Sequence, residues 1–373
     1  MKNVMALVFA NIYDSSLGQL TNKRTLASLP FGGRYRQIDF ALSNLSNAGV
    51  RHIGIVTQYN YQSLMNHIGA GEEWDLELEE GGLEYITPYS MGISTTFRGK
   101  LEAIYAATKS FLAIGKEEYV ILADAAVVCA INLDEVIQAH IDSGRDVTVV
   151  VKSGIANGQK QLDLAVSLNE DGEISDMAVD YAAPSEFLAS MGIFVMRKEL
   201  LMEAAEACVA HNRYRFERDF ILQDWADGKL SVGAWEFGDV AFFNESTEEY
   251  FRNNLAIIDR NVRHSLYRDD LTIYTRVRDQ VPTYYGEGSE VDDCIVADGC
   301  TLLGRVENSV LFRGVRVSTG AVVKNCVVMS RSEIGIGAQL EYCILDKEVR
   351  ISAGVKLIGT PEHPVILNRG DVV

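Results

Sequence analysis

Short apolar runs alternate with longer amphipathic stretches through about the first 280 residues of the chain. Two of the stretches, residues 101–112 and 198–210, have the length and apolar spacing of helices. The apolar runs have the length of buried strands, and they lie at residues 4–10, 53–57, 119–123, 147–151 and 192–196. Strands that alternate with helices are typical of a sheet wrapped by helices. The pattern therefore predicts an N-terminal α/β domain over residues 1–278, with a Rossmann-like, mostly parallel sheet.

The pattern changes near residue 280, where the helical stretches stop. From residue 286 to 359, glycines separate short β-branched runs, and Val322, Val328, Ile334 and Leu340 follow one another at six-residue steps. A six-residue step is typical of a left-handed parallel β-helix, in which three hexads make one triangular coil. An antiparallel sandwich with irregular strands is the alternative. We predict a β-helix domain over residues 279–373, with residues 279–285 as the linker.

The loop after the first predicted strand, residues 10–17, stands where many α/β proteins bind nucleotide phosphates. A phosphate loop needs glycines, because a backbone without Cβ atoms can bring its N–H groups close to phosphate oxygens, and a nearby cation neutralises the charge. This loop instead carries the bulky Ile12 and Tyr13 and the negatively charged Asp14. The sequence thus predicts the architecture of a nucleotide enzyme without a working phosphate site.

Composition and charge exclude several classes of partner. The chain has 373 residues, 47% of them hydrophobic, and a formal net charge of -18. Nucleic-acid binding depends on clustered Lys and Arg, so we expect no nucleic-acid partner. No apolar run has the length of a membrane span, and the first predicted strand follows Met1 almost directly, so we expect no signal peptide, no membrane partner and a cytoplasmic location. The six cysteines lack paired zinc-type spacing, and we expect reduced, mostly buried thiols.

Residues 30–44, Pro-Phe-Gly-Gly-Arg-Tyr-Arg-Gln-Ile-Asp-Phe-Ala-Leu-Ser-Asn, resemble the signature of bacterial glucose-1-phosphate adenylyltransferases. Further short motifs follow in the order and spacing of that family, and they begin at Thr57, His67, Trp74, Phe97 and Ser190. The resemblance runs nearly end to end. It implies a GT-A-like nucleotidyltransferase domain with a mixed sheet, followed by a left-handed β-helix. Members of the family join ATP and glucose 1-phosphate into ADP-glucose and pyrophosphate on Mg²⁺ in glycogen synthesis, and they work as tetramers.

That reaction brings two polyanions together, so its site needs cations, metal and N–H donors. The resemblance implies that three of the family's cations are missing here. The arginine that grips the triphosphate falls on Ser16, the lysine before Pro-Phe-Gly-Gly falls on Leu26, and the sugar-phosphate lysine falls on Tyr181. The glycines of the family's phosphate loop fall on Asn11, Ile12 and Asp14.

The family's two metal-binding carboxylates are displaced as well. Its Gly-Asp pair falls on Asp124 and Ala125, and strand side chains alternate between faces. We therefore expect Asp124 to point the opposite way from the family's aspartate unless the backbone bulges. The second carboxylate falls on Arg215, which cannot bind Mg²⁺. We predict no catalytic residue, no metal site and no cofactor on this chain.

Two groups of family positions are retained. Those that line the family's nucleotide and sugar pocket predict that a weakened pocket persists, and they are Gln58, Gly99, Asp180, Ser190 and Gly192. The second group lies beside the altered loop and comprises Lys23, Arg24, Arg34 and Arg36. In the family, the Lys-Arg pair lies in a site for phosphorylated activator sugars, so we predict an effector-anion site between the domains. The alternative is that Arg34 and Arg36 brace Asp39 and the first helix as structural ion pairs.

These losses predict a non-catalytic or weakly catalytic regulatory subunit of glucose-1-phosphate adenylyltransferase. It would join a catalytic homologue in a heterotetramer, or form a homo-oligomer alone, and respond to a sugar phosphate, with Mg²⁺ bound by the catalytic partner. The first alternative is an active sugar nucleotidyltransferase with a site rebuilt around Asp124 and Asp219. The second is a β-helix acyltransferase, which commonly takes a histidine from a coil as general base, but no histidine lies between Tyr284 and Ile358. We also expect coil ends that expose Val310–Phe312 and so favour oligomerisation.

Overall fold

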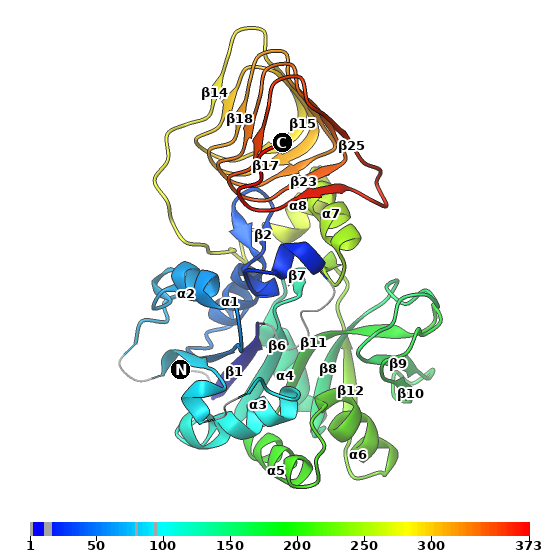
Figure 1. Ribbon diagram of the computed structural model, residues 1–373. Helices are drawn as coiled ribbons and strands as arrows, with labels where there is room; N and C mark the ends of the chain where they lie inside the picture. Colours follow the sequence, from blue (N-terminus) through cyan, green and yellow to red (C-terminus); the bar gives the residue numbers. More distant parts are fainter. Residues whose placement is uncertain (1–2, 11–16, 79–80, 93–94) are drawn as a thin grey trace. The chain divides into compact units, whose positions relative to one another are not determined.

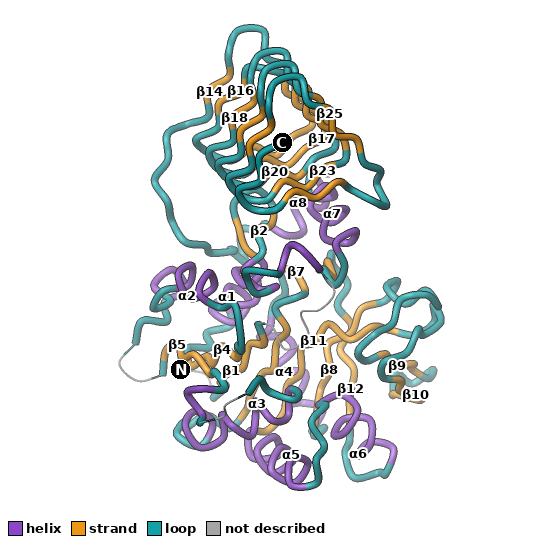
Figure 2. The backbone as a smooth tube through the Cα atoms, viewed as in Figure 1, coloured by secondary structure: helices purple, strands orange, loops and turns teal. Residues whose placement is uncertain are grey.

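The computed structural model describes residues 3–10, 17–78, 81–92 and 95–373. Its contacts divide the chain into two compact units, whose elements are labelled in Figure 1 and coloured by type in Figure 2. The first unit comprises residues 1–12, 40–241 and 269–274, and the second comprises residues 13–39, 242–268 and 275–373. Segments 13–39 and 242–268 thus group with the β-helix, although the predicted boundary places them in the N-terminal domain. A buried ion pair between Arg24 and Asp346 ties the first of these segments to the β-helix, and a buried hydrogen bond from the Tyr250 hydroxyl to the Pro30 carbonyl, at 2.5 Å, joins the second segment to the first.

A mixed sheet of nine strands forms the centre of the first unit. Its strands are β1 (Val4–Phe9), β4 (His52–Val56), β5 (Gly82–Ile86), β6 (Tyr119–Asp124), β8 (Val147–Lys152), β9 (Ala165–Leu168), β10 (Ile174–Ala178), β11 (Leu188–Arg197) and β12 (Val232–Glu236). The order is β10-β9-β11-β6-β1-β4-β5, with β8 paired to both β11 and β12. β1 runs parallel to β4 and β6, whereas β11 runs antiparallel to β6 and β8. Every predicted strand is present, and the mixed sheet is confirmed.

The longer elements around this sheet are α1 (Gln37–Asn47), α2 (Gln62–Ile68), α3 (Lys100–Ala107), α4 (Leu133–Ser143), α5 (Lys198–Ala210) and α6 (Gln223–Ala226). Two π-helical turns, η6 (Thr108–Leu112) and η7 (Glu217–Leu222), follow α3 and precede α6. The short elements are η4 (Glu72–Trp74), η5 (Tyr89–Met91), β7 (Val127–Cys129) and β13 (Ala241–Phe243). Leu7, Leu122 and Phe194 from the strands pack with Leu101 and Phe220 in one buried cluster. This packing holds the start of α3 and η7 close to the end of β6.

The second unit contains a left-handed parallel β-helix, as the sequence predicted. Its strands are β14 (Tyr284–Tyr285), β15 (Glu290–Val296), β16 (Thr301–Leu302), β17 (Arg305–Leu311), β18 (Arg316–Val317), β19 (Val322–Lys324), β20 (Val327–Val328), β21 (Glu333–Ile334), β22 (Gln339–Glu341), β23 (Cys343–Leu345), β24 (Arg350–Ile351), β25 (Lys356–Ile358) and β26 (Val365–Leu367). The other elements of the unit are η2 (Gly18–Thr21), η3 (Leu26–Ser28), β2 (Pro30–Phe31), β3 (Tyr35–Arg36), α7 (Thr247–Ala256) and α8 (Arg260–Leu266). All described pairing between successive coils is parallel.

The central coils take 17 residues rather than three hexads. Arg305 pairs with Val322, Val322 with Gln339, and Gln339 with Lys356, each 17 positions apart. Val322 therefore stacks on Gln339 and not on Leu340, so the six-residue step breaks once in each coil. Each coil is therefore one residue shorter than three hexads. The shortening occurs at a corner where the backbone turns tightly in the left-handed region, as at Asn325, with φ of 50°.

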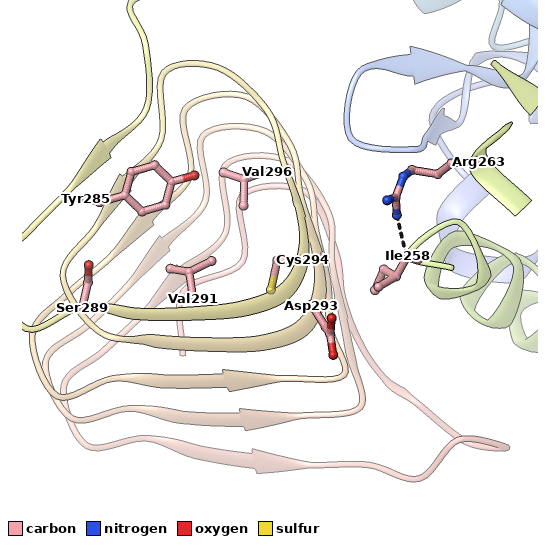
Figure 3. A pocket seen from close by; sticks show the side chains of 8 residues that line it. All are labelled: Ile258, Arg263, Tyr285, Ser289, Val291, Asp293, Cys294 and Val296. Carbon is pink, nitrogen blue, oxygen red and sulfur yellow. Dashed lines mark hydrogen bonds between the residues drawn. The ribbon is translucent and has the colours of Figure 1, made fainter. Parts of the chain in front are cut away.

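The first coil of the β-helix is open at its outer end (Figure 3). Within the described residues, β14 and β15 each pair with one neighbouring strand only. Tyr284 and Tyr285 are 61% and 52% exposed. The expectation that Val310–Phe312 is exposed is wrong: all three side chains are buried, because β17 lies between β15 and β20 rather than at an end.

Two simpler expectations concern thiols and membranes. All six cysteines are free, and all but Cys294 are buried, as predicted. Among the helices that the structure describes, none combines the length and apolar character needed to span a bilayer.

Candidate functional site

A close backbone contact sets the start of α3 in the first unit. Gly99 lies against the carbonyl of Tyr214, so that a Cβ atom on residue 99 would be 2.2 Å from the carbonyl oxygen. The next turn is fixed by the amide of Leu101, which donates to the same oxygen at 3.1 Å. A side chain at position 99 would push these segments apart. Because the helix starts here, Lys100 is directed inward and is only 2% exposed.

The ammonium of Lys100 lies between two carboxylates from different elements. Its Nζ atom donates to Oδ2 of Asp124 at 2.7 Å and to Oε1 of Glu217 at 2.5 Å. Asp124 ends β6 and Glu217 begins η7. The three residues form a buried ion cluster at the carboxyl end of a central strand, where α/β proteins commonly bind ligands.

Asp124 faces a retained pocket position. The backbone of Gly192, with φ of 67°, packs so closely on Asp124 that a Cβ atom there would lie 2.4 Å from Oδ2. The pairing of β11 with β8 shifts register between Ser190 and Ile193, so the chain bulges beside this contact. Burial raises the pKa of Asp124 to about 6; Lys100 opposes this rise, and the charges of Glu217 and Asp163 add to it. The low polarity of its surroundings is thus the main reason that the charged form of Asp124 is disfavoured.

Arg215, the second cation of this region, is held by an aspartate. Its Nη1 atom lies 2.7 Å from Oδ2 of Asp180, and its Nη2 atom donates to Oδ1 at 2.8 Å. This two-point geometry is the strong form of an arginine–carboxylate pair. Asp180 adopts a left-handed backbone conformation, with φ of 53°, and its carbonyl accepts from Nε2 of Gln161. Asp180 therefore neutralises the charge of Arg215.

The other predicted pocket residues hold backbone segments. The Gln58 side-chain oxygen accepts from the amide of Phe97 at 2.9 Å, and the Ser190 hydroxyl accepts from the amide of Gly192 at 3.1 Å. The structure thus brings Gly99, Asp180 and Gly192 to the ion cluster, while Gln58 and Ser190 fix the chain on either side. Of the predicted phosphate loop, residues 11–16 lie outside the described part of the chain.

Sequence reasoning missed Lys100 and Glu217. Lys100 directly follows a recognised motif, Phe97-Arg98-Gly99, and Glu217 stands where the Phe-Gly pair of the family has glycine. Both are charged residues at the start of a helical segment, a position that is usually exposed. Only the structure shows that both are buried, with exposures of 2% and 5%.

Asp219 does not join the ion cluster. Its Oδ2 atom accepts from the amides of Tyr214 and Arg215 at 2.8 and 2.9 Å, and Nε of Arg218 donates to Oδ1 at 2.7 Å. This carboxylate organises the turn before η7. A site rebuilt from Asp124 and Asp219 would need both carboxylates to leave these partners.

The residues of the ion cluster do not fit Mg²⁺. The ion needs several oxygen ligands in octahedral geometry. The described residues contain no group of three or more His, Cys, Asp or Glu side chains placed to hold a metal. A cation beside Asp124 and Glu217 would also be repelled by the ammonium of Lys100, which already donates to both.

A cluster of basic side chains occupies the second unit. We call it the basic cluster; it comprises Arg24, Arg36, Arg276, Arg278 and Lys347. The pKa of Arg36 is lowered to about 10, chiefly by burial; Asp39 opposes this fall, and the charges of Arg278, Arg24 and Arg276 contribute to it. Burial also lowers the pKa of Lys347 to about 7, and Arg36 and Arg24 are the next causes. Such mutual repulsion indicates a surplus of positive charge.

Arg24 is the most deeply placed member of the basic cluster. Its guanidinium forms an ion pair with Asp346, and both side chains are less than a tenth exposed. Of the other predicted effector residues, Arg36 joins Arg24, whereas Lys23 and Arg34 are exposed. The alternative bracing role is supported by the Arg36 amide, which donates to Asp39 at 2.9 Å, and by the charge of Asp39, which raises the pKa of Arg36 against the effect of burial. Sequence reasoning missed Arg276, Arg278 and Lys347, which come from the segment before the β-helix and from one of its turns.

Comparisons with known proteins cover nearly the whole chain. The Nucleotidyl transferase family model matches residues 15–236, and the model described as GlmU-like, C-terminal hexapeptide matches residues 280–363. The "Glycogen biosynthesis protein GlgD" of Bacillus subtilis (strain 168) is 30% identical over 98% of this chain and 96% of its own length. The glucose-1-phosphate adenylyltransferase of Fervidobacterium nodosum is 30% identical over 96% of this chain and 86% of its own. That of Thermotoga maritima is 31% identical over 87% and 77%.

Proposed function

This chain belongs to the nucleotidyltransferase family of the glucose-1-phosphate adenylyltransferases, and from that premise we propose that it is a non-catalytic, regulatory member, which assembles with a catalytic homologue and modulates it. The pathway would be glycogen biosynthesis, which forms part of the name of the Bacillus subtilis relative. The proposal rests on the charge balance around the ion cluster of the first unit.

The observation that carries the proposal is the ammonium of Lys100 between Asp124 and Glu217. Nucleotidyl transfer gathers negative charge, so a working site needs cations whose charge remains available to phosphate oxygens. Here the side chains of two cationic residues lie near those of four acidic residues, so their formal charges sum to -2. The cations are Lys100 and Arg215, and the carboxylates are Asp124, Glu217, Asp163 and Asp180. A triphosphate would meet net negative charge at the point where it should be stabilised. Mg²⁺ would be held by the catalytic partner.

The alternative is an active enzyme with a rebuilt site around Asp124 and Asp219. The hydrogen bonds of Asp219 to the amides of Tyr214 and Arg215 disfavour it, since they hold that carboxylate in the turn before η7. The acyltransferase alternative is disfavoured by the family membership.

We expect the purified chain alone to form no ADP-glucose above background from ATP, glucose 1-phosphate and Mg²⁺. When it is mixed with the catalytic homologue from the same cell, we expect the maximal rate or the effector response of that enzyme to change, because the two would assemble. Product formation measured by chromatography, together with analytical ultracentrifugation of the mixture, tests both points. Heat-denatured chain is the control. Turnover by the chain alone would support the rebuilt-site alternative.

We also infer that the basic cluster binds the anionic groups of a sugar-phosphate effector. Its support is the crowding of cations around Arg36 and Lys347, which an anion would relieve. The five side chains all belong to the second unit, so this site would lie within one unit rather than between domains.

Anion binding by the basic cluster should depend on pH through Lys347. Because the pKa of this lysine is lowered to about 7, it is mostly neutral at pH 8 and mostly charged at pH 6. Sulfate, whose charge is constant over this range, should therefore bind about tenfold more tightly at pH 6, and calorimetry measures this. Lys347→Met should abolish the pH dependence, while the exposed Lys229→Met should retain it. Equal affinity of the wild type at both pH values would contradict the inference.

The open first coil supports assembly with a partner chain. In Figure 3 the side chains of Tyr285, Val291 and Val296 point into the mouth of this coil. Strands at an open sheet edge present backbone groups that another chain can pair with. A homologous subunit that covered this end would complete the hydrogen bonding of β14 and β15.

A further inference from the structure

A cavity of about 590 Å³ lies in the second unit, between α7 and one corner of the β-helix. Its volume is in the range of sites for small organic ligands. One wall is a face of α7 with helical spacing, formed by Glu248, Phe251, Arg252 and Leu255. The facing wall is a column of corner residues from successive coils, namely Asn308, Asn325 and Tyr342, which recur every 17 positions. The cavity is separate from the basic cluster and from the pocket of the first unit, which involve other residues.

The backbone conformation at Tyr342 is tolerated better by the Asp and Asn residues that stand at the equivalent corners of the preceding coils. The corner residues Asp293, Asn308, Asn325 and Tyr342 all have positive φ, between 43° and 50°. Asp and Asn tolerate this region because their short side chains can bond to the local backbone, whereas a bulky aromatic residue there is strained. The conformation is imposed by bonds between coils: the amide of Tyr342 donates to the Lys324 carbonyl at 3.2 Å, and Val365 donates to the Tyr342 carbonyl at 3.0 Å. Strain kept at a cavity wall points to a function for the ring.

The two asparagines offer a hydrogen-bonding edge. Nδ2 of Asn308 donates to Oδ1 of Asn325 at 2.6 Å. This leaves Oδ1 of Asn308 as an acceptor and Nδ2 of Asn325 as a donor, and neither makes a further side-chain hydrogen bond with the residues that the structure describes. Asn325 is 7% exposed, so its donor is accessible only from a confined space. A donor and an acceptor are the groups that the edge of a nucleobase requires, as in the recognition of adenine by asparagine.

The third wall exists because the coil repeat is interrupted. Val327 pairs with Ile344 after 17 positions, but Ile344 pairs with Ile366 after 22. The extra residues contribute Pro361, Glu362 and His363 to the cavity. A parallel β-helix does not need this insertion, since the preceding coils close without it.

We propose that this cavity binds a nucleoside through its base. The ring would pack against Tyr342, with Phe251 and Leu255 opposite, and the two amides would bond to its edge. The apolar side chains Phe251 and Leu255 and the aromatic ring of Tyr342 favour a planar heterocycle over a sugar, which needs polar contacts around its whole perimeter. The carboxylates of Glu248 and Glu362 outnumber the guanidinium of Arg252 at the rim, which disfavours a polyphosphate. The proposal does not depend on the regulatory function.

The test uses adenosine as the probe and the full-length chain. We expect the wild type to bind it in calorimetry, and Tyr342→Asn to weaken binding at least tenfold. Tyr342→Phe, which keeps the ring, should bind within twofold of the wild type. AMP should bind no more than threefold tighter than adenosine if recognition lies in the base. Absence of adenosine binding at millimolar concentration, or equal binding by wild type and Tyr342→Asn, would overturn the proposal, the latter by placing the nucleoside elsewhere.

Stability supplies an independent measurement on the same variants. Because asparagine tolerates the left-handed conformation, Tyr342→Asn should melt at the same temperature as the wild type or higher, despite the lost ring. A clearly lower melting temperature would mean that Tyr342 is kept for packing, and would overturn the argument from strain. Adenosine should raise the melting temperature of the wild type and of Tyr342→Phe but not that of Tyr342→Asn.

Discussion

Replacing Lys100 with methionine is expected to lower the free energy of unfolding by about 3–5 kcal/mol. The substitution removes the ammonium that lies 2.7 Å from Asp124 and 2.5 Å from Glu217, and it leaves two carboxylates close together without a cation. Methionine fills a similar volume, so the loss would come from the charge and not from a cavity. Urea unfolding followed by circular dichroism measures the change.

The pH dependence of this loss identifies its cause. Without Lys100, which lowers the pKa of Asp124, that pKa should rise further above its usual range. The folded variant would then hold a proton more tightly than the unfolded chain, and its stability should recover as the pH falls. We expect a smaller loss at pH 5 than at pH 8. Lys229→Met, which removes an exposed partner of Asp227, is the control and should leave the midpoint unchanged. A loss under about 1 kcal/mol at pH 8 would show that Lys100 does not hold the two carboxylates.

The second large effect is expected at Arg24. Arg24→Met should destabilise the second unit by about 3–5 kcal/mol, because it leaves Asp346 as a buried charge without its guanidinium. The double variant Arg24→Met/Asp346→Leu should recover most of this loss, since it removes both charges. The wild type, the two single variants and the double variant form a double-mutant cycle, which measures the coupling energy between Arg24 and Asp346.

A matched control for Arg24 lies on the surface of the same β-helix. Arg331 pairs with Glu348, and the two side chains are 65% and 37% exposed. Arg331→Met should therefore change stability by about 0–1 kcal/mol. Additive effects of the Arg24 and Asp346 substitutions would show that the buried pair contributes no coupling, and would remove the case for Arg24 as the anchor of the basic cluster.

The local pattern of the sequence was sufficient for the elements of both units. Residues 198–210 form α5 as predicted, and residues 101–112 form α3 together with η6. The β-helix followed from β-branched runs and glycines, because that repeat is local. The length of a coil could not be predicted from the six-residue apolar step. At one corner of each coil, Asn308, Asn325 or Tyr342 turns the chain with one residue fewer than that step implies.

The candidate site, too, could be predicted from the sequence only in part. The prediction that cations and carboxylates are missing came from positions such as Ser16, Leu26 and Arg215, because a motif indicates which residue stands where. The pairing of the charges that are present could not be predicted from the sequence. Lys100 meets Glu217 across 117 positions of the chain, and Arg24 meets Asp346 across 322.

The sequence by itself determined the family and the two architectures, and it predicted the loss of the usual phosphate and metal ligands, since these depend on residue type, order and short-range spacing. Only the tertiary structure decided which charges neutralise one another, how the basic cluster is composed and where a strained tyrosine meets a cavity. The physical reason is that burial and charge pairing depend on distances between segments far apart in the chain. The periodic spacing of hydrophobic residues along the chain does not determine those distances.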